Sequence, residues 1–506
     1  MSKVIEQPTR PFIPYSLCIL LFVCVWLQVF IARNATLDTI LLQILGSCMA
    51  AALGLWYVKY AHTSLMTVGT VLLLLVIIFI RSSFIYASQM ASVDLLESTA
   101  IHNFELVVSR DLVYKNHAWT GQANVMYQGR CIGSVGLYAK EPFLRETHLC
   151  CEGRFTQYKD KEFSEEQFKR GVLGSIQITK VNSKTYGEGI IGEVAQFREN
   201  CISQLQPEQS FGRALVACGL CAYRPSLYSF NIPRIFMRCG LMHLIAISSC
   251  HMVILSVFID TFLKKLTIKP LLRGVVNLFL LSSYALFCGL PASAMRAILL
   301  VEQKYVMQYV GRKNHTLSAV SIVALFMLCI DPQLSVNIAF TLSLACIFGM
   351  NIYGSLAQYY AKIAFHLSGY GTIQKILRKP FSDVRNTMCA TTVAQLSCLP
   401  ISCMYFGHFS LLAPLSSALI TSLFSLLSLF GIGAIALCWF KPAQDVAFCL
   451  VDFLGQFIET LTSFLSERSF ASVSLTDMSW IVSLLVFAAM VALYVFWPKG
   501  KRVVLS

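Results

Sequence analysis

Long apolar runs alternate with short polar connections over most of the chain, and one long polar stretch interrupts them. Three runs come first, Pro14–Ala32, Asp38–Val58 and Leu65–Tyr86, each close to the roughly 20 residues that cross a bilayer core. After the polar stretch at 87–210, further apolar segments are predicted at 236–261, 271–289, 290–302, 316–330, 334–354, 388–406, 411–438, 446–465 and 479–497. This pattern predicts a polytopic α-helical membrane protein with about 10–12 transmembrane segments.

Two of these segments leave the topology open. Segment 290–302 is too short for a lipid-exposed span and carries Arg296, so we expect a broken or re-entrant helix that lines a protein interior. Segment 446–465 contains Asp452 and Glu459, and it either crosses the membrane or lies flat at its surface. Basic loops around Lys264 and Lys375 and the basic tail around Lys501 indicate cytoplasmic loops and a cytoplasmic C-terminus. With the N-terminus also inside and 87–210 outside, both uncertain segments cross or neither does.

The polar stretch at 87–210 has a different period. Phe104, Leu106 and Val108 alternate with polar residues, and glycine-containing turns separate about five such runs, which predicts a small β-barrel. Residues Gly192–Leu205 are then expected to form an amphipathic helix that leads back to the membrane, with Val194, Phe197, Cys201 and Leu205 along one side.

The composition supports the assignment as a membrane protein, and the distribution of charged residues explains the positive net charge. Hydrophobic residues make up 56% of the chain and charged residues 13%, with a mean hydropathy of +0.65. These values exclude a soluble and a disordered chain, because a soluble fold needs a more polar exterior. The net charge is +14, but residues 87–210 hold 13 Lys and Arg against 15 Asp and Glu. The positive excess therefore lies in the membrane part, where cytoplasmic loops collect it.

Four motifs in register resemble the ComEC-type competence proteins. A small-residue segment, Ala214-Leu-Val-Ala-Cys-Gly219, precedes Met242-His-Leu-Ile-Ala-Ile-Ser-Ser-Cys-His251. Downstream come Gly289-Leu-Pro-Ala-Ser-Ala-Met-Arg-Ala297, then Asp331-Pro332 with Phe340-Thr-Leu-Ser-Leu-Ala345, and then Phe406-Gly-His-Phe-Ser410 with Pro414. The resemblance covers roughly 210–430, and the stretch 87–210 stands where this family carries an external OB-fold domain.

The resemblance implies an inner-membrane channel that passes single-stranded DNA into the cytosol during natural transformation. It also implies a periplasmic DNA receptor and a cytosolic ATP-driven motor as partners, beside the lipid bilayer, and leaves room for a homo-oligomer. The localisation it implies is the bacterial inner membrane, multi-pass, with both termini cytoplasmic and 87–210 extracytoplasmic. The domains expected on this basis are 1–86 (three spans), 87–210 (OB-like barrel and amphipathic helix), 211–440 (channel core) and 441–506 (C-terminal helices and basic tail).

The chain departs from the family pattern at several positions. Ser249 stands where the family has glycine, Thr341 where it has glutamine, and serines near Ser417 and Ser422 replace an Asn–Pro pair. The His-x-His-x-Asp-His motif of a C-terminal metallo-β-lactamase-like nuclease, which long members carry, is absent from this sequence. We therefore expect no enzyme activity, no catalytic residue, no metal and no cofactor, and a separate nuclease for the other DNA strand.

Candidate functional residues fall into two groups. The channel candidates combine Arg296, a charge within an apolar run, with polar residues of the family motifs; together they are Arg238, His243, Ser248, His251, Arg296 and Ser343. For Arg296 a phosphate path and a structural ion pair are weighed equally, while buried histidines and helix-packing serines are the commoner roles of the others. DNA-contact candidates in the barrel are rings for base stacking and nearby cations: Tyr114, Trp119, Tyr127, Arg130, Arg154 and Phe155, with Lys140 and Arg145 as further charges.

The sequence also leaves open a disulfide and two alternatives to the DNA channel. Cys131, Cys150, Cys151 and Cys201 lie in the polar stretch, and an oxidising compartment would allow one disulfide among them. Two other functions remain open: a secondary transporter or lipid-precursor flippase that uses Arg296 for an anionic substrate, and a membrane relative that has lost transport.

Overall fold

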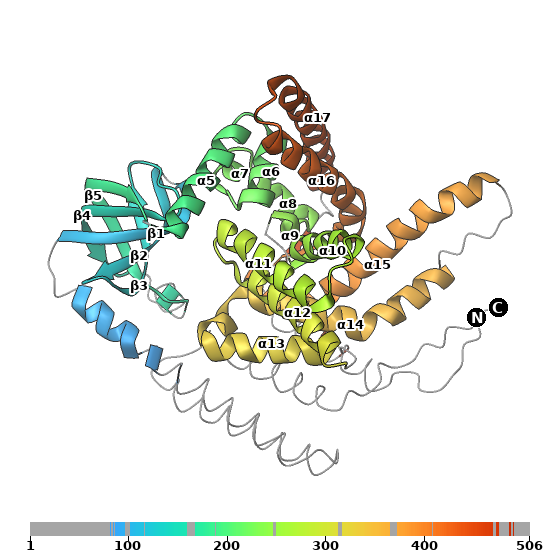
Figure 1. Cartoon of the computed structure of the whole chain (residues 1–506), viewed down its shortest axis with the longest axis horizontal. Coiled ribbons are helices and arrows are strands. Elements are labelled where there is room, and N and C mark those ends of the chain that lie inside the picture. Colours follow the sequence, from blue (N-terminus) through green and yellow to red (C-terminus); the bar gives the residue numbers. More distant parts are fainter. Residues whose placement is uncertain are drawn as a thin grey trace, which may run out of the picture.

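The structure, a computed structural model, describes residues 102–468 except for gaps at 116, 159–166, 169, 188, 246–248, 312–315, 365–371 and 407. Fragments within 81–96 and 472–489 are also described. The three predicted N-terminal spans (except for fragments of 81–86), most of segment 479–497 and Ser248 lie outside the described residues. Figure 1 shows a β-barrel at one side of the molecule, a body of helices beside it, and two long helices, α14 and α15, that project from the opposite side.

The polar stretch folds into a closed five-stranded barrel, as its alternation predicted. The strands are β1 (His102–Lys115), β2 (Ala118–Tyr127), β3 (Arg130–Ala139), β4 (Thr147–Thr156) and β5 (Val172–Tyr186), in the order β1-β2-β3-β5-β4. All pairs are antiparallel except β3 with β5, and β4 closes the barrel on β1. A five-stranded Greek-key barrel of this kind is OB-like. Inward-facing Leu106, Val108 and Val135 form its core.

The barrel core includes a helix that precedes the first strand. Residues 87–96 are helical, and Val93 and Leu96 are buried among the barrel side chains. The Ser92 hydroxyl donates a hydrogen bond to the carbonyl oxygen of Ile132 at the start of β3. This helix therefore belongs to the barrel and covers part of its interior.

Helices make up almost all of the remaining described chain. They are α5 (Ile190–Leu205), α6 (Phe211–Cys221), α7 (Pro225–Ser229), α8 (Ile232–Cys239), α9 (Met242–Ile245), α10 (Ser249–Lys265), α11 (Pro270–Cys288), α12 (Ala292–Tyr309), α13 (Thr316–Ile330), η1 (Pro332–Val336), α14 (Ile338–Ala364), α15 (Thr372–Phe406), α16 (Ala413–Ala436) and α17 (Lys441–Ser466). Two short strands, β6 (His408–Ser410) and β7 (Ser472–Ser474), pair with each other.

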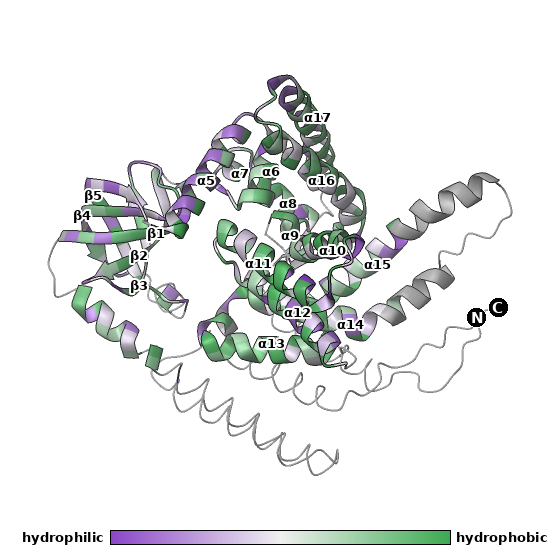
Figure 2. Ribbon diagram, in the orientation of Figure 1, coloured by the Kyte–Doolittle hydropathy of each residue, from purple (hydrophilic) through white to green (hydrophobic). Residues whose placement is uncertain are grey.

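Three of these helices, α11, α16 and α17, are long and apolar enough to cross a membrane. Large apolar side chains such as Phe258, Phe279 and Leu429 are exposed on the outer faces of α10, α11 and α16. Figure 2 shows hydrophobic residues dominating the helical body, whereas hydrophilic residues gather on the barrel and α5. Apolar side chains that face outward are expected of helices that contact lipid.

The centre of the helical body is α6, which is buried on nearly every side. Gly212 packs against the backbone of α17 at Val451 and Gly455, and Gly431 of α16 packs against Val216. Small residues allow the helix backbones to approach this closely. The small-residue segment noted in the sequence is thus the packing centre for α16 and α17.

Three predicted segments differ from the structure. Segment 388–406 is the end of the longer helix α15, which starts at Thr372 and includes Lys375 of the predicted basic loop. Segment 290–302 is part of α12, which continues to Tyr309, so it is an 18-residue helix and not a short piece. Its polar second half, from Glu302 onward, hid this continuation from the hydropathy pattern. Segment 236–261 is not one helix, because Gly240 adopts φ +71° and ends α8. A β-carbon at Gly240 would lie 2.2 Å from that of Ala413, so this break is fixed by packing.

Candidate nucleic-acid interface

A buried ion pair joins the barrel to the helical body. Both nitrogens at the tip of Arg198 in α5 donate to the carboxylate of Asp111 in β1, at 3.0 and 2.5 Å. The Arg198 Nε donates to the carbonyl oxygen of Cys221 at the end of α6, at 2.7 Å. Burial is the largest influence on the pKa of Arg198 and lowers it, but the charge of Asp111, the hydrogen bonds to its carboxylate and two nearby cysteines together outweigh burial, so the net shift is upward. One carboxylate and one guanidinium therefore join β1, α5 and α6.

This pairing corrects the expected orientation of α5. Phe197, assigned to the apolar side, is 60% exposed. Cys201 and Leu205 are buried as predicted, and the buried side also carries Ala195 and Arg198. The helix turns its one arginine inward because Asp111 and a carbonyl oxygen satisfy it there.

Arg145 makes a second connection between the barrel and the body. Its Nη2 donates to the carbonyl oxygens of Phe287, at 2.8 Å, and Leu286, at 3.4 Å, in the last turn of α11. Gly289 caps this helix with φ +87°, and a β-carbon there would lie 2.1 Å from Arg145 Nη1. A cation at carbonyl groups that end a helix is favourable. Arg145, expected as a charge for DNA on the barrel surface, is thus a buried docking residue.

Three arginines gather next to this junction. They are Arg110 of β1, Arg170 just before β5, and Arg224 just before α7, which packs against β1. All three are exposed to solvent along part of their length. Burial of the rest of the Arg110 side chain, followed by the positive charges of Arg224 and Arg170, lowers its pKa. Like charges held together on a surface favour a polyanionic ligand. We name Arg110, Arg170 and Arg224 the arginine cluster.

The DNA-contact candidates of the barrel lie in three places. Tyr114 and Trp119 are paired across the β1–β2 turn, with ring centroids 5.4 Å apart. Tyr127 and Arg130 flank the β2–β3 turn at the other end of β2, about 27 Å away by strand rise. Arg154 and Phe155 lie near the end of β4, where Phe155 packs on the barrel core beside Gly174. The six residues therefore do not form one surface.

Arg296 lies deep in the helical body. Its exposed fraction is 0%, and the helix α12 that carries it packs against α10, α11, α13 and α14. Buried Ala294, Ala297 and Ile298 surround it on its own helix. A positive charge thus sits at the centre of the helices that match the family motifs.

The other channel candidates are spread over several elements. Arg238 ends α8 and donates to the carbonyl oxygen of Arg468 at 3.5 Å, and Ser343 is half-buried in α14. His243 is exposed in the four-residue α9, whereas His251 belongs to α10. The expectation that both histidines lie on nearby sides of one helix is therefore wrong. The helix α9 ends at Ile245, before His251, and α10 starts at Ser249.

The four cysteines of the polar stretch differ in their exposure to solvent. Cys131 and Cys150 are exposed, Cys151 and Cys201 are buried, and all four carry free thiols. Burial and the neighbouring Cys150 raise the pKa of Cys151 to about 12. Among the residues that the structure describes, no group of three or more His, Cys, Asp or Glu could hold a metal ion. The disulfide and the lack of enzyme activity stay predictions.

Sequence reasoning missed Asp111, Arg198 and the arginine cluster. The sequence contains one indication for Asp111 and one for Arg198, the two members of the buried ion pair. The alternation of β1 fails at Arg110-Asp111, where the structure has an irregular register, and Arg198 occupies an otherwise apolar helix face. The proximity of Arg170 and Arg224 has no local signal, because they are far apart in the chain.

Comparison with known families decides the identity. A model of the competence protein family matches residues 226–500, more than half of the chain. The chain belongs to the competence protein family. This match confirms the resemblance to ComEC-type proteins and begins just after the barrel, α5 and α6. No curated protein and no solved structure matches the chain.

Membership of the competence protein family indicates the process in which the chain takes part. A competence protein has a role in DNA uptake for transformation, and the apolar helices point to a membrane protein. In this competence protein, Arg296 lies within the matched region, whereas the barrel that carries Arg110 lies outside it.

Proposed function

We propose that this competence protein conducts one strand of DNA through the inner membrane into the cytosol. The observation that carries the proposal is Arg296, a fully buried guanidinium on α12 in the middle of the family's helices. A charge at membrane depth costs roughly 2.5–3.5 kcal/mol on insertion scales, and such residues mark substrate paths. A guanidinium suits the passing phosphates of a DNA strand.

The arginine cluster supports the same function from outside the membrane part. Arg110, Arg170 and Arg224 lie where β1 and α7 meet, beside the junction that connects the barrel to α6 and α11. A strand that is bound there through its phosphates would reach the outer ends of the helices next to α12. Binding through phosphates is independent of sequence and depends strongly on salt.

The proposal includes the orientation and the partners of the chain. Both α12 and α17 cross the membrane in this proposal, the barrel is extracytoplasmic, and both termini are cytoplasmic. A periplasmic DNA receptor delivers the strand, and an ATP-driven motor in the cytosol pulls it. The chain itself performs no covalent chemistry, and a separate nuclease removes the other strand.

The test is entry of fluorescently labelled DNA into the cytosol of cells that lack the chain. Deletion should leave DNA outside the cytosol, and the wild-type chain should restore entry. Arg296→Met, which keeps an apolar stem of similar length, should restore less than about a tenth of wild-type entry. Arg296→Lys, which keeps the charge, should restore more than Arg296→Met, and immunoblots of membranes should show equal amounts.

Two outcomes would contradict the proposal in different ways. If Arg296→Met restores full entry, Arg296 is a structural residue and lies outside the DNA path. If deletion of the whole chain leaves entry intact, the chain does not conduct DNA, and transport of a smaller anionic substrate becomes the leading function.

A further inference from the structure

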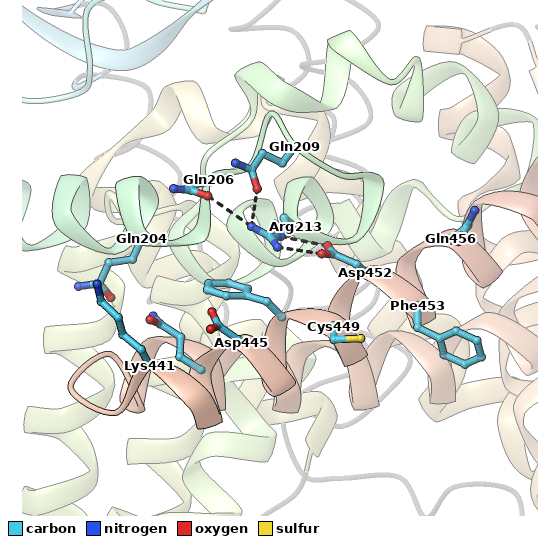
Figure 3. Close-up of a pocket in the computed structure, with 12 residues that line it drawn as sticks. Gln204, Gln206, Gln209, Arg213, Lys441, Asp445, Cys449, Asp452, Phe453 and Gln456 are labelled. Atoms are coloured by element: carbon cyan, nitrogen blue, oxygen red, sulfur yellow. Dashed lines mark hydrogen bonds and ion pairs between the residues drawn. The ribbon is translucent and has the colours of Figure 1, made fainter.

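A polar pocket of 870 Å³ lies between α17 and the turn that joins α5 to α6. Eight of its lining residues lie on α17, at spacings of three and four residues, and Figure 3 shows Lys441 and Asp452 on the side of this helix that faces the turn. The opposite side of the pocket is formed by Gln204 at the end of α5, Gln206 and Gln209 of the turn, and Arg213 at the start of α6. Five of the eight residues on α17 are polar or charged: Lys441, Gln444, Asp445, Asp452 and Gln456. This polar stripe is unusual on a helix that is otherwise apolar enough to cross a membrane.

Arg213 forms the wall of this pocket and is fully engaged there. Its Nε and Nη2 donate to the carboxylate of Asp452 at 3.0 and 2.8 Å, and its Nη1 donates to Gln209 Oε1 at 2.7 Å. Its guanidinium also lies 4.3 Å from the centre of the Phe448 ring. Because Arg213 and Asp452 neutralise each other, they shape the pocket and leave little charge for a ligand.

One cation and one carboxylate are left for a ligand. Lys441 and Asp445 stand one turn apart on the exposed side of α17, and neither pairs with an oppositely charged side chain in the described part of the chain. Side chains four apart on a helix have β-carbons about 5–6 Å apart. A ligand that matches both carries a positive and a negative group a few ångströms from each other, whereas a purely anionic ligand meets Asp445. The glutamine amides around them can both donate and accept hydrogen bonds.

A second stripe of α17 lies next to the polar one. It consists of Val446, Leu450, Phe453 and Phe457, at spacings of four, three and four residues, and each is between 37% and 66% exposed. Phe453 belongs to the pocket lining as well. Just before the helix, Trp439 and Phe440 are exposed, as aromatic residues at a membrane surface commonly are. The pocket is thus polar on one side and continuous with an apolar track on the other.

We propose that this pocket binds a zwitterionic phospholipid, with its ammonium group at Asp445, its phosphate at Lys441 and its acyl chains along Val446, Leu450, Phe453 and Phe457. The glutamines of the α5–α6 turn complete the hydrogen bonds of the headgroup. The bound lipid would cover the junction between α17 and the α5–α6 turn. This inference does not rest on DNA transport, so its failure would leave the proposed function untouched.

The test is lipid binding to the purified full-length chain by native mass spectrometry. After detergent washing, phosphatidylethanolamine and phosphatidylglycerol are titrated in, and the wild-type chain should retain the zwitterionic lipid at about tenfold lower concentration. Asp445→Lys should reverse this preference in favour of phosphatidylglycerol. Glu467→Lys makes the same charge change on the same chain beyond the pocket and should keep the wild-type preference.

Three results would overturn the proposal: equal retention of both lipids by the wild-type chain, an unchanged preference in Asp445→Lys, or the same reversal in Glu467→Lys. Glycerophosphoethanolamine, which has the same headgroup without acyl chains, separates a lipid from a soluble ligand. Displacement of the bound lipid by an equal concentration of this compound would exclude the apolar track as part of the site. The elution volume in size-exclusion chromatography verifies that each variant is folded.

Discussion

Gly289 fulfils two requirements at one position. It takes φ +87°, where an L side chain is strained, and it leaves the space that the Arg145 guanidinium occupies against the carbonyl groups of Phe287 and Leu286. In the family motif that begins here, the glycine therefore serves the connection to the barrel, while Arg296 in the same motif serves the interior.

Replacing Gly289 by alanine should loosen the barrel from the body. The backbone strain alone costs about 1–2 kcal/mol, and displacement of Arg145 adds to it. We expect a lower thermal unfolding midpoint for the full chain in detergent. Gly129→Ala is the matched control, since Gly129 also has positive φ but nothing lies within 4 Å of the added β-carbon. Equal losses in the two variants would mean that Arg145 contributes nothing beyond backbone strain.

At the scale of elements, the arginine cluster depends on where α7 meets β1. Arg110 lies at a point of irregular register in β1, and Arg224 immediately precedes α7. Neither element alone presents more than one of these charges. Their combination makes a basic surface on a barrel region whose overall charge is slightly negative.

Charge reversal in the cluster should weaken binding of single-stranded DNA. For the full chain, the double variant Arg110→Glu and Arg224→Glu should reduce the slope of log affinity against log salt by about two, one for each lost phosphate contact. Lys180→Glu, on the exposed part of β5, is the control and should change the slope by less. An unchanged slope in the double variant, measured by fluorescence anisotropy, would remove the cluster from the DNA-binding surface.

Elements with a local signal could be predicted from the sequence, and those fixed by distant partners could not. The barrel followed from alternation because each strand has one buried face, as at Phe104, Leu106 and Val108. Arg296 was found because a charge interrupts an apolar run. The helix break at Gly240 could not be predicted, since it depends on packing against Ala413. The Asp111–Arg198 ion pair could not be predicted either, because 87 residues separate its members.

For the whole molecule, the central feature is that barrel and helices are connected by buried charges. Asp111 and Arg198 are almost fully enclosed, with side-chain exposures of 7% and 3%. A buried pair is costly to break from one side, because the remaining charge has no compensation. The position of the barrel relative to the C-terminal ends of α6 and α11 is therefore fixed in the folded protein.

Removing one member of this pair should cost more than replacing both. Asp111→Ala should destabilise the full chain by about 3–5 kcal/mol and expose the α5 region to protease, because Arg198 is left buried and unpaired. The double variant Asp111→Leu with Arg198→Met should recover most of the resistance. Thermal unfolding and limited proteolysis of the full chain measure both effects. If the double variant is as labile as the single one, the pair itself supplies the stability.

The contact between Arg145 and the last carbonyl groups of α11 also has a consequence for biogenesis. The guanidinium belongs to a strand region made early, and its acceptor at Phe287 is synthesised 142 residues later. The contact can therefore close only after α11 has been synthesised. Until then the Arg145 guanidinium, already made, lacks the two carbonyl oxygens that accept its hydrogen bonds in the folded protein.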